Sequence, residues 1–153
     1  MKLLRLRLNR LANTFLMLQV LGLAASEVWR PVTGFERYEV SNLGRVRSKD
    51  TVHLDKRGIK QPIKGRMLKP CIDRHGYSYV KFRSAGRRRV FKQVHRLVAI
   101  AFVPGDHAKQ VNHKNLNKQD NRDINLEWMT REENQEHARL MRYLLQEEMA
   151  RAA

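Results

Sequence analysis

Residues 111–134, VNHKNLNKQDNRDINLEWMTREEN, hold the side chains whose types and spacing could do chemistry. The stretch contains six asparagines and one histidine, His113. Asparagine side chains stitch polar loops together through hydrogen bonds to the backbone, and their amide oxygens also coordinate hard cations. An imidazole with an ordinary pKa of about 6.5 can serve as a general base at neutral pH. The stretch is therefore either a polar loop or a metal site built from amides and one histidine.

Short elements of alternating type are predicted to position these side chains. Residues 110–113 are expected to form a strand, residues 114–124 an exposed loop, and residues 125–129 the returning strand. Thr130 and Glu133 have the spacing of a capping box, which starts a helix. The apolar face predicted for this helix contains Ala138, Met141, Leu145 and Met149.

Packing of this helix on the hairpin would bring His113 and Asn134 together. Asn112 would reach the same pocket only if its backbone left regular strand geometry. Phosphodiester hydrolysis needs a base for water, a Lewis acid for the developing charge and a means of holding the leaving oxygen. Mg²⁺ accepts amide and phosphate oxygens and keeps several waters, so one or two protein ligands suffice. Because asparagine carries no charge, such a site would bind metal weakly without DNA.

Four motifs in order, HRLVAIAFVPG, VNH, NLEW and REEN, resemble those of the HNH homing endonucleases, which have the ββα-metal fold. They cover about residues 94–138. The upstream segment EVWRPVTGFERYEVSNLGRVRS separately resembles the NUMOD-type module found in front of such nucleases. The two resemblances imply an α+β fold, in which small antiparallel β modules precede a ββα-metal (HNH) nuclease motif with a C-terminal helix.

The resemblance also implies roles for particular residues. His113 corresponds to the general base, and Asn125 to the central asparagine that fixes the geometry of the hairpin and the histidine. Asn134 corresponds to a metal ligand, with Mg²⁺ or Mn²⁺ as the cofactor. Asn112 lies where several relatives have a metal-binding aspartate, so its amide weakens the expected metal affinity. His137 is either a phosphate or metal contact or an ordinary exposed helix residue.

Other conspicuous side chains in the sequence are expected to have structural roles. His95 is interpreted as part of a helix start and its packing. Trp128 is expected to anchor the core beneath the hairpin, and Trp29 to anchor the upstream module. Asn121 and Asp123 are expected to stabilise the loop through side-chain hydrogen bonds to its backbone.

The charge of the chain points to a nucleic-acid partner. The 153 residues contain 31 Lys and Arg against 15 Asp and Glu, and the net charge of +16 exceeds what solubility requires. Residues 56–96 contain fourteen Lys or Arg and one acidic residue, Asp73. Phosphate neutralisation and counterion release make double-stranded DNA the expected partner. The residues expected to contact its backbone are Lys81, Arg83, Arg87, Arg88, Arg89 and Lys92.

Four segments are predicted along the chain. They are an N-terminal extension (1–26), a NUMOD-type module (27–50), a basic β-rich DNA-binding segment (51–93) and an HNH nuclease domain with a C-terminal helix (94–153). A hairpin is predicted around the SNLG turn, and a loop over residues 50–65. Three strands are predicted over residues 66–72, 77–82 and 88–94, with Ser78, Val80 and Phe82 on one face of the second strand.

Residues 1–26 allow three interpretations. Basic residues, an apolar stretch and small residues follow one another as in a secretory signal. Leucines at helical spacing indicate instead a basic amphipathic helix, and a third interpretation is an appended segment with Met17 as the true start. We favour the second and third, and therefore an intracellular protein without stable membrane association, with secretion through residues 1–26 as the minority alternative. The resemblance to homing endonucleases implies that the protein is phage- or intron-encoded. Cys71 is the only cysteine, which excludes an intrachain disulfide and fits a reducing compartment.

Three functional hypotheses follow. The first is a metal-dependent DNA endonuclease of the homing type, which nicks one strand as a monomer and cuts both strands as a DNA-assembled dimer. The second is a DNA-binding protein that keeps the HNH fold with weak or no cleavage, which the neutral Asn112 leaves open. The third is a basic RNA-binding module of the ribosomal type, which explains the charge but not the spacing of the motifs.

Overall fold

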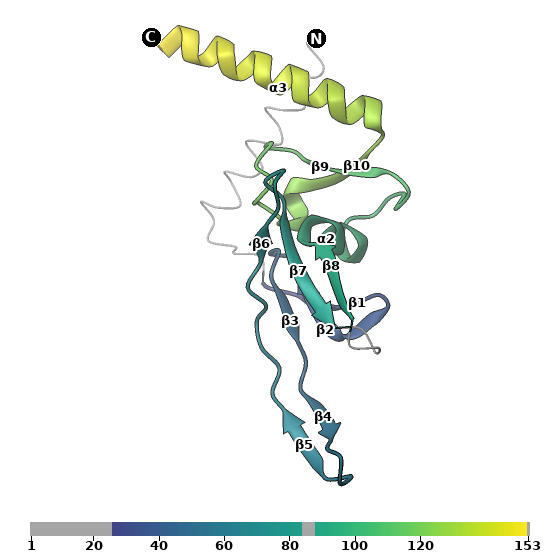
Figure 1. Ribbon diagram of the computed structural model, residues 1–153. Coiled ribbons are helices and arrows are strands. Elements are labelled where there is room, and N and C mark those ends of the chain that lie inside the picture. The colour runs from purple at the N-terminus through teal and green to yellow at the C-terminus, as the bar shows by residue number, and fades with distance from the viewer. Residues whose placement is uncertain (1–25, 84–87, 153) are drawn as a thin grey trace.

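The computed structural model describes residues 26–83 and 88–152, which fold into small antiparallel sheets and helices (Figure 1). The predicted α+β class is confirmed. Residues 1–25, which hold nearly all of the predicted N-terminal extension, and Arg87 lie outside the described residues. No helix within the described ranges has the length and the apolar composition needed to cross a membrane.

The first sheet has the strand order β1–β2–β3 and contains the tight turn predicted from the SNLG motif. Its strands are β1 Trp29–Val32, β2 Phe35–Ser41 and β3 Val46–Ser48. Gly44 has a φ of 80° in this turn, a conformation that glycine adopts without steric cost. Tyr38 of β2 stacks on Phe82 of a later strand, with 4.2 Å between ring centroids. The first sheet therefore shares its core with the rest of the chain.

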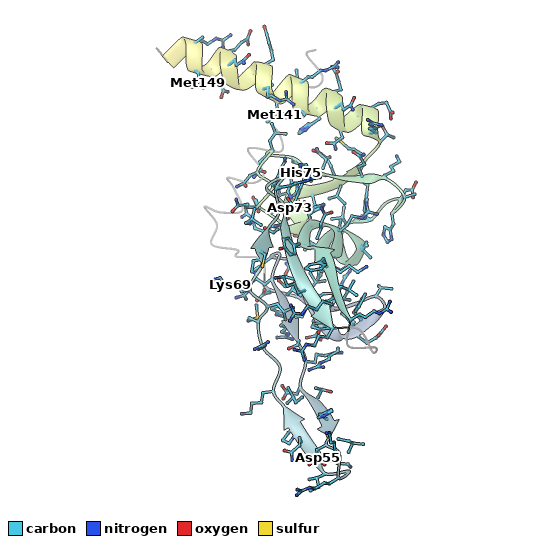
Figure 2. All side chains as sticks on the ribbon, viewed as in Figure 1. Asp55, Lys69, Asp73, His75, Met141 and Met149 are labelled. Atoms are coloured by element: carbon cyan, nitrogen blue, oxygen red, sulfur yellow. The ribbon has the colours of Figure 1, made fainter. Side chains whose placement is uncertain are left out.

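Residues 51–63 form a hairpin, so the loop predicted over residues 50–65 is wrong. The strands of this hairpin are β4 Thr51–Leu54 and β5 Lys60–Ile63. The Asp55 carboxylate closes the turn by accepting hydrogen bonds from the N–H groups of Arg57 and Ile59, at 2.8 and 3.0 Å. Pro62 is tolerated because a two-stranded sheet leaves half of its N–H groups unpaired. Figure 2 shows Asp55 at the tip of this arm, which projects away from the rest of the molecule.

The third sheet has the order β6–β7–β8, with β7 in the centre. Its strands are β6 Cys71–Ile72, β7 Ser78–Arg83 and β8 Arg89–Gln93. The alternation predicted for β7 is confirmed, because Ser78, Val80 and Phe82 are all buried. The strand predicted over residues 66–72 is reduced to β6 and one isolated bridge. Pro70 explains the interruption, because it has no N–H group to give to a ladder.

The C-terminal half has the predicted order of helix, hairpin and helix. Its elements are α2 Val94–Phe102, β9 Gln110–His113, the 3-10 helix η1 Asp123–Asn125, β10 Leu126–Met129 and α3 Arg131–Ala152. Asn125 ends η1 instead of starting the strand, because its N–H group bonds to the carbonyl of Arg122 at 3.0 Å. The capping box is confirmed: Thr130 N–H donates to Glu133 Oε2 at 2.7 Å, and Glu133 N–H donates to Thr130 Oγ1 at 3.2 Å.

Helix α2 lies at the centre of the fold and packs against strands from both halves of the chain. Its residues Val94, Val98 and Ala99 are almost completely buried. They join Val40 of the first sheet and Leu126 of β10 in one continuous hydrophobic core. The β modules and the predicted nuclease motif are therefore held as one folding unit, since burial of this shared apolar surface stabilises both.

Helix α3 crosses the β9–β10 hairpin at the end of the molecule opposite the β4–β5 arm (Figure 1). Its later turns extend past the hairpin. Figure 2 shows Met149 in the part of the helix beyond the hairpin, and its side chain is 74% exposed. The predicted apolar face is thus wrong for the last turns, because the helix is longer than the surface on which it packs.

The two tryptophans differ in their environments. Trp128 packs against the core and donates its indole N–H to the Val103 carbonyl at 3.0 Å, as expected of an anchor. Trp29 lies outside the buried core, which corrects its predicted role. The guanidinium of Arg47 lies 4.1 Å from the Trp29 ring centroid, so this ring supports a cation at the surface.

Candidate active site

A cleft of about 390 Å³ lies between the β9 end of the hairpin, the following loop and helix α3. Asn112, His113 and Asn134 all line it. The expected convergence of His113 and Asn134 is therefore observed. Asn112 reaches the cleft although β9 remains paired with β10, so the expected departure from strand geometry is wrong. Asn112 and His113 both lie at the end of β9, and both line the cleft although each is almost completely buried. Its lining also includes three cations, Lys118, Arg139 and Arg142.

A hydrogen bond fixes which ring nitrogen of His113 carries the proton. The Nε2 atom lies 3.1 Å from Oδ1 of Asn121. The orientation of that amide is fixed, because its Nδ2 donates to the carbonyl of Gln119 at 3.1 Å. Oδ1 can only accept, so Nε2 must donate, and Nδ1 of the neutral ring is left as the basic atom.

Burial sets the charge of His113 at neutral pH. The side chain is 4% exposed. Loss of solvent lowers its pKa below the ordinary value, although the hydrogen bond to Asn121 acts in the opposite sense. The imidazole is therefore neutral at pH 7 and able to accept a proton.

Asn121 is the residue that sequence reasoning missed at this site. We expected it to stitch the loop, and its bond to Gln119 does so, but its carbonyl oxygen also holds the imidazole of His113. Its side chain is buried. The signal in the sequence was its position eight residues after His113, and no local pattern distinguishes it from Asn115 or Asn117.

Asn125 acts on the loop that carries Asn121. Its Nδ2 donates to Asn115 Oδ1 at 2.9 Å and to the Asp120 carbonyl at 2.8 Å, and its Oδ1 accepts from Asn115 N–H at 3.1 Å. Asn125 thus closes both ends of the loop. Its carbonyl also accepts from Lys114 N–H at 2.8 Å, directly after His113, so Asn125 supports the end of β9 as well as the loop.

An ion pair stiffens the same loop. Arg122 binds the Asp120 carboxylate through both Nε and Nη2 at 2.7 Å. This bidentate pair holds the pKa of Asp120 below its usual range. The Asp123 N–H donates to the Asn42 carbonyl at 2.9 Å, so the loop is also fastened to the β2–β3 turn.

Gly44 of that turn lies directly against Asn121. A Cβ atom at Gly44 would stand 3.0 Å from Asn121 Cβ and 3.0 Å from its carbonyl oxygen. Only a residue without a side chain allows this approach. The first β module therefore supports the loop that orients His113, through residues about 80 positions earlier in the chain.

A second histidine lies beside the first. His95 is the second residue of α2 and is 5% exposed, which agrees with its expected structural role. Its ring centroid is 5.3 Å from that of His113 and 4.9 Å from that of Tyr77. Burial, followed by the nearby His113, lowers the pKa of His95 to about 4. His95 is therefore neutral over the whole physiological range and does not compete for a proton.

The asparagines of the cleft are held through their amino groups. Asn112 Nδ2 donates to Glu127 Oε1 at 2.9 Å and lies 3.2 Å from His137 Nδ1. Asn134 Nδ2 donates to Gln110 Oε1 at 3.0 Å. His137 contacts Asn112 instead of lining the cleft.

The oxygens of Asn112 and Asn134 suit a hard divalent cation. Among residues 26–83 and 88–152, no three His, Cys, Asp or Glu side chains cluster in a way that could hold a metal ion. Amide oxygens are ligands that such cations accept, and the remaining ligands would come from water and from phosphate, which would also supply negative charge in a cleft lined by three cations. Neither amide oxygen accepts a hydrogen bond from a described residue, so both are available.

The basic residues of β7 and β8 fall on two faces of the sheet. Lys81 pairs with Phe91, and Arg83 with Arg89, so these four share the outward face, next to the exposed Arg88. Lys92 pairs with the buried Val80 and therefore points to the opposite face, where its Nζ lies 5.3 Å from the Phe35 ring centroid. The expected DNA-contacting set is thus divided by the two-residue period of the strand.

Two family models match the chain. The NUMOD4 motif matches residues 27–83, and the HNH endonuclease model matches residues 92–136, which include His113, Asn125 and Asn134. Residues 92–136 are thus an HNH endonuclease domain that follows a NUMOD4 motif. The resemblance to HNH homing endonucleases with a NUMOD-type module is confirmed.

Named HNH endonucleases are similar to most of the chain. It is 38% identical over 111 residues to the DNA endonuclease I-HmuI of Bacillus phage SP01. The aligned region covers 71% of this chain and 56% of that protein. It is 38% identical over 118 residues to an uncharacterized HNH endonuclease of Acanthamoeba polyphaga mimivirus, covering 74% of the chain and 26% of that protein.

A solved structure of an HNH endonuclease is also similar to this one. It is described as DNA binding and cleavage by the HNH homing endonuclease I-HmuI, and it matches with a TM-score of 0.58 and 33% identity. The match covers 74% of this chain and 60% of that one. The chain thus spans between 26% and 60% of the length of these HNH endonucleases.

Proposed function

We propose that the protein is a metal-dependent DNA endonuclease of the homing type, with His113 as the general base. The observation that carries this proposal is the cleft, which joins a neutral histidine of fixed tautomer to two available amide oxygens and three cations. The similarity to I-HmuI, which is named as a DNA endonuclease, supports the same activity.

In this proposal Nδ1 of His113 removes a proton from the attacking water. Asn121 keeps the other ring proton on Nε2 and supports the positive charge that forms on the ring. Lys118, Arg139 and Arg142 bind the scissile phosphate, since all three line the cleft. Asn112 and Asn134 would hold Mg²⁺ or Mn²⁺, which as a Lewis acid stabilises the charge that develops on the phosphate and the leaving oxygen.

Double-stranded DNA would be bound along the basic outward face of β7 and β8. Lys81, Arg83 and Arg89 lie there with the exposed ring of Phe91. Arg88 adjoins this face, whereas Arg87 lies outside the described residues. Such a surface binds the phosphate backbone without reading sequence.

The β4–β5 arm would extend this DNA-binding surface. It carries Lys56, Arg57 and Lys60, and its apolar side chains Val52 and Leu54 are each 58% exposed. Cations on an exposed arm of this kind gain contact with phosphates.

One active site per chain predicts a nick in one strand by a monomer. The proposal is tested with supercoiled plasmid and Mg²⁺ or Mn²⁺, using the parent protein and His113→Ala, with DNA affinity measured in parallel. The parent should nick, and His113→Ala should bind DNA equally well but nick about 10²- to 10⁴-fold more slowly. His107→Ala serves as the matched control, because His107 is an exposed histidine outside the cleft.

Two outcomes would contradict the proposal. Nicking at the parent rate by His113→Ala would refute the role of this histidine. DNA binding without any nicking by the parent would favour the second hypothesis, a DNA-binding protein that keeps the HNH fold. The neutral side chain of Asn112 is the observation that favours that alternative.

A further inference from the structure

Asn112 is held by two hydrogen-bond acceptors that come from different elements. Glu127 is its direct cross-strand neighbour on β10, and the Glu127 carboxylate accepts from Asn112 Nδ2 at 2.9 Å. His137 lies on α3, and its Nδ1 is 3.2 Å from the same nitrogen. The Asn112 side chain is 4% exposed, so it has little freedom to rearrange.

These contacts determine which way the amide of Asn112 faces. A carboxylate oxygen can only accept, so the atom facing Glu127 must be the amino nitrogen. An NH₂ group has two protons, one for Glu127 and one for His137 Nδ1. The carbonyl oxygen lies on the other branch of the planar amide and is free of both partners.

We propose that Glu127 and His137 are positioning residues that present the amide oxygen of Asn112 to the cleft and so enable a neutral side chain to act as a metal ligand. The inference rests on the proposed metal-dependent function. A carboxylate at this position would offer an oxygen in either orientation. An amide offers one only when its nitrogen is held away from the site.

Glu127 has a second effect on the same ligand. A hydrogen bond to a carboxylate polarises the amide and raises the negative charge on its oxygen. The carboxylate of Glu127 therefore supplies, one hydrogen bond behind the ligand, part of the charge that asparagine lacks. Residues behind the ligands of metal sites typically change metal affinity 10- to 100-fold when they are removed.

The test measures Mn²⁺ binding directly, by electron paramagnetic resonance, to the protein in complex with duplex DNA. All proteins carry His113→Ala so that the DNA stays intact. Glu127→Met, which removes the acceptor, should weaken Mn²⁺ binding about tenfold. Glu36→Gln, an exposed glutamate on β2, should leave it unchanged.

Asn112→Asp separates positioning from a merely structural role. In the Glu127→Met background it should restore Mn²⁺ affinity, because a carboxylate needs no orientation. With Glu127 present, it should give no such gain, because two carboxylates would then stand at hydrogen-bond distance and repel each other. Thermal melts of every variant check that each chain is folded.

Two results would overturn the inference: Mn²⁺ affinity unchanged in Glu127→Met, or an equal gain from Asn112→Asp in both backgrounds. If the proposed metal-dependent function is itself wrong, the experiment gives a different result. In that case the protein with intact Asn112 and Glu127 would itself show no Mn²⁺ binding in the presence of DNA.

Discussion

Protonation of His95 is expected to destabilise the fold as the pH falls below 6.5. The imidazole is 5% exposed, and burial lowers its pKa from 6.5 to about 4. Between pH 6.5 and about 4, the imidazole of His95 is protonated in the unfolded chain but not in the folded chain. The free energy of unfolding therefore has its full value, as far as His95 is concerned, above pH 6.5, and it decreases as the pH falls to about 4.

The structure gives the size of this effect. The gap between 6.5 and about 4 corresponds to about 3 kcal/mol, at about 1.4 kcal/mol for each tenfold change in proton affinity. About 2 kcal/mol of it should be lost by pH 5. Carboxylates with a lowered pKa, such as Asp120, titrate below this window and do not obscure it. His113 adds a smaller loss in the same direction, because its pKa is also lowered.

The assay is urea unfolding of the parent and His95→Phe at pH 7, 6 and 5. Phenylalanine keeps a planar aromatic ring, cannot be protonated and removes the His95 Nδ1 atom, which is buried without a hydrogen-bond partner among the described residues. We therefore expect His95→Phe to be at least as stable as the parent at pH 7 and about 2 kcal/mol more stable relative to it at pH 5. Equal losses by both chains between pH 7 and 5 would refute the reasoning.

Three further predictions concern the support of the site. Gly44→Ala should slow plasmid nicking while DNA affinity stays constant in a gel-shift assay, because its Cβ would stand 3.0 Å from Asn121; an unchanged nicking rate would contradict this. Asn121→Asp should move the acid-side fall of the cleavage rate to higher pH, because a carboxylate beside Nε2 raises the pKa of His113. If this fall does not shift, the contact with residue 121 does not control the pKa of His113. Gly105→Ala should lower the free energy of unfolding by about 1–3 kcal/mol in urea, because its Cβ would lie 2.6 Å from Trp128 Cδ1; a value near zero would show that the indole moves aside.

The positions of His113 and Asn134 could be predicted because local rules fix them. The capping box at Thr130 sets where α3 begins, and the strand pairing sets where β9 ends, at His113. Both patterns lie within residues 110–134, the same segment whose structure they determine. The convergence of the two residues therefore followed from the sequence once the helix was packed on the hairpin.

The support of His113 could not be predicted, because it depends on residues far apart in the chain. The loop that brings Asn121 to the histidine is held in part by Asn42 and Gly44 of the first sheet. No pattern within residues 114–124 contains that information. The acceptors that hold the Asn112 amide likewise come from β10 and α3 and become neighbours only in the folded chain.

One other expectation was wrong for a simple physical reason. Residues 50–65 were expected to form a loop because turn formers are frequent there, yet the Asp55 carboxylate closes a tight turn and allows pairing.

The charge pattern also does not show which face of the sheet each cation occupies. Lys81 is paired with Phe91, and Lys92 is the next residue along β8, so Lys81 and Lys92 lie on opposite faces of the sheet. DNA contact by Lys92 stays a prediction.

The pH dependence of the single-turnover nicking rate tests the role of His113 most directly. In the parent, the rate should be constant at neutral pH and should fall on the acid side with a midpoint below 6.5, because burial lowers the pKa of the base. In His113→Ala, the rate should be about 10²- to 10⁴-fold lower and should no longer follow that midpoint. A variant that retains the parent's rate or its midpoint would contradict the assignment of His113 as the general base.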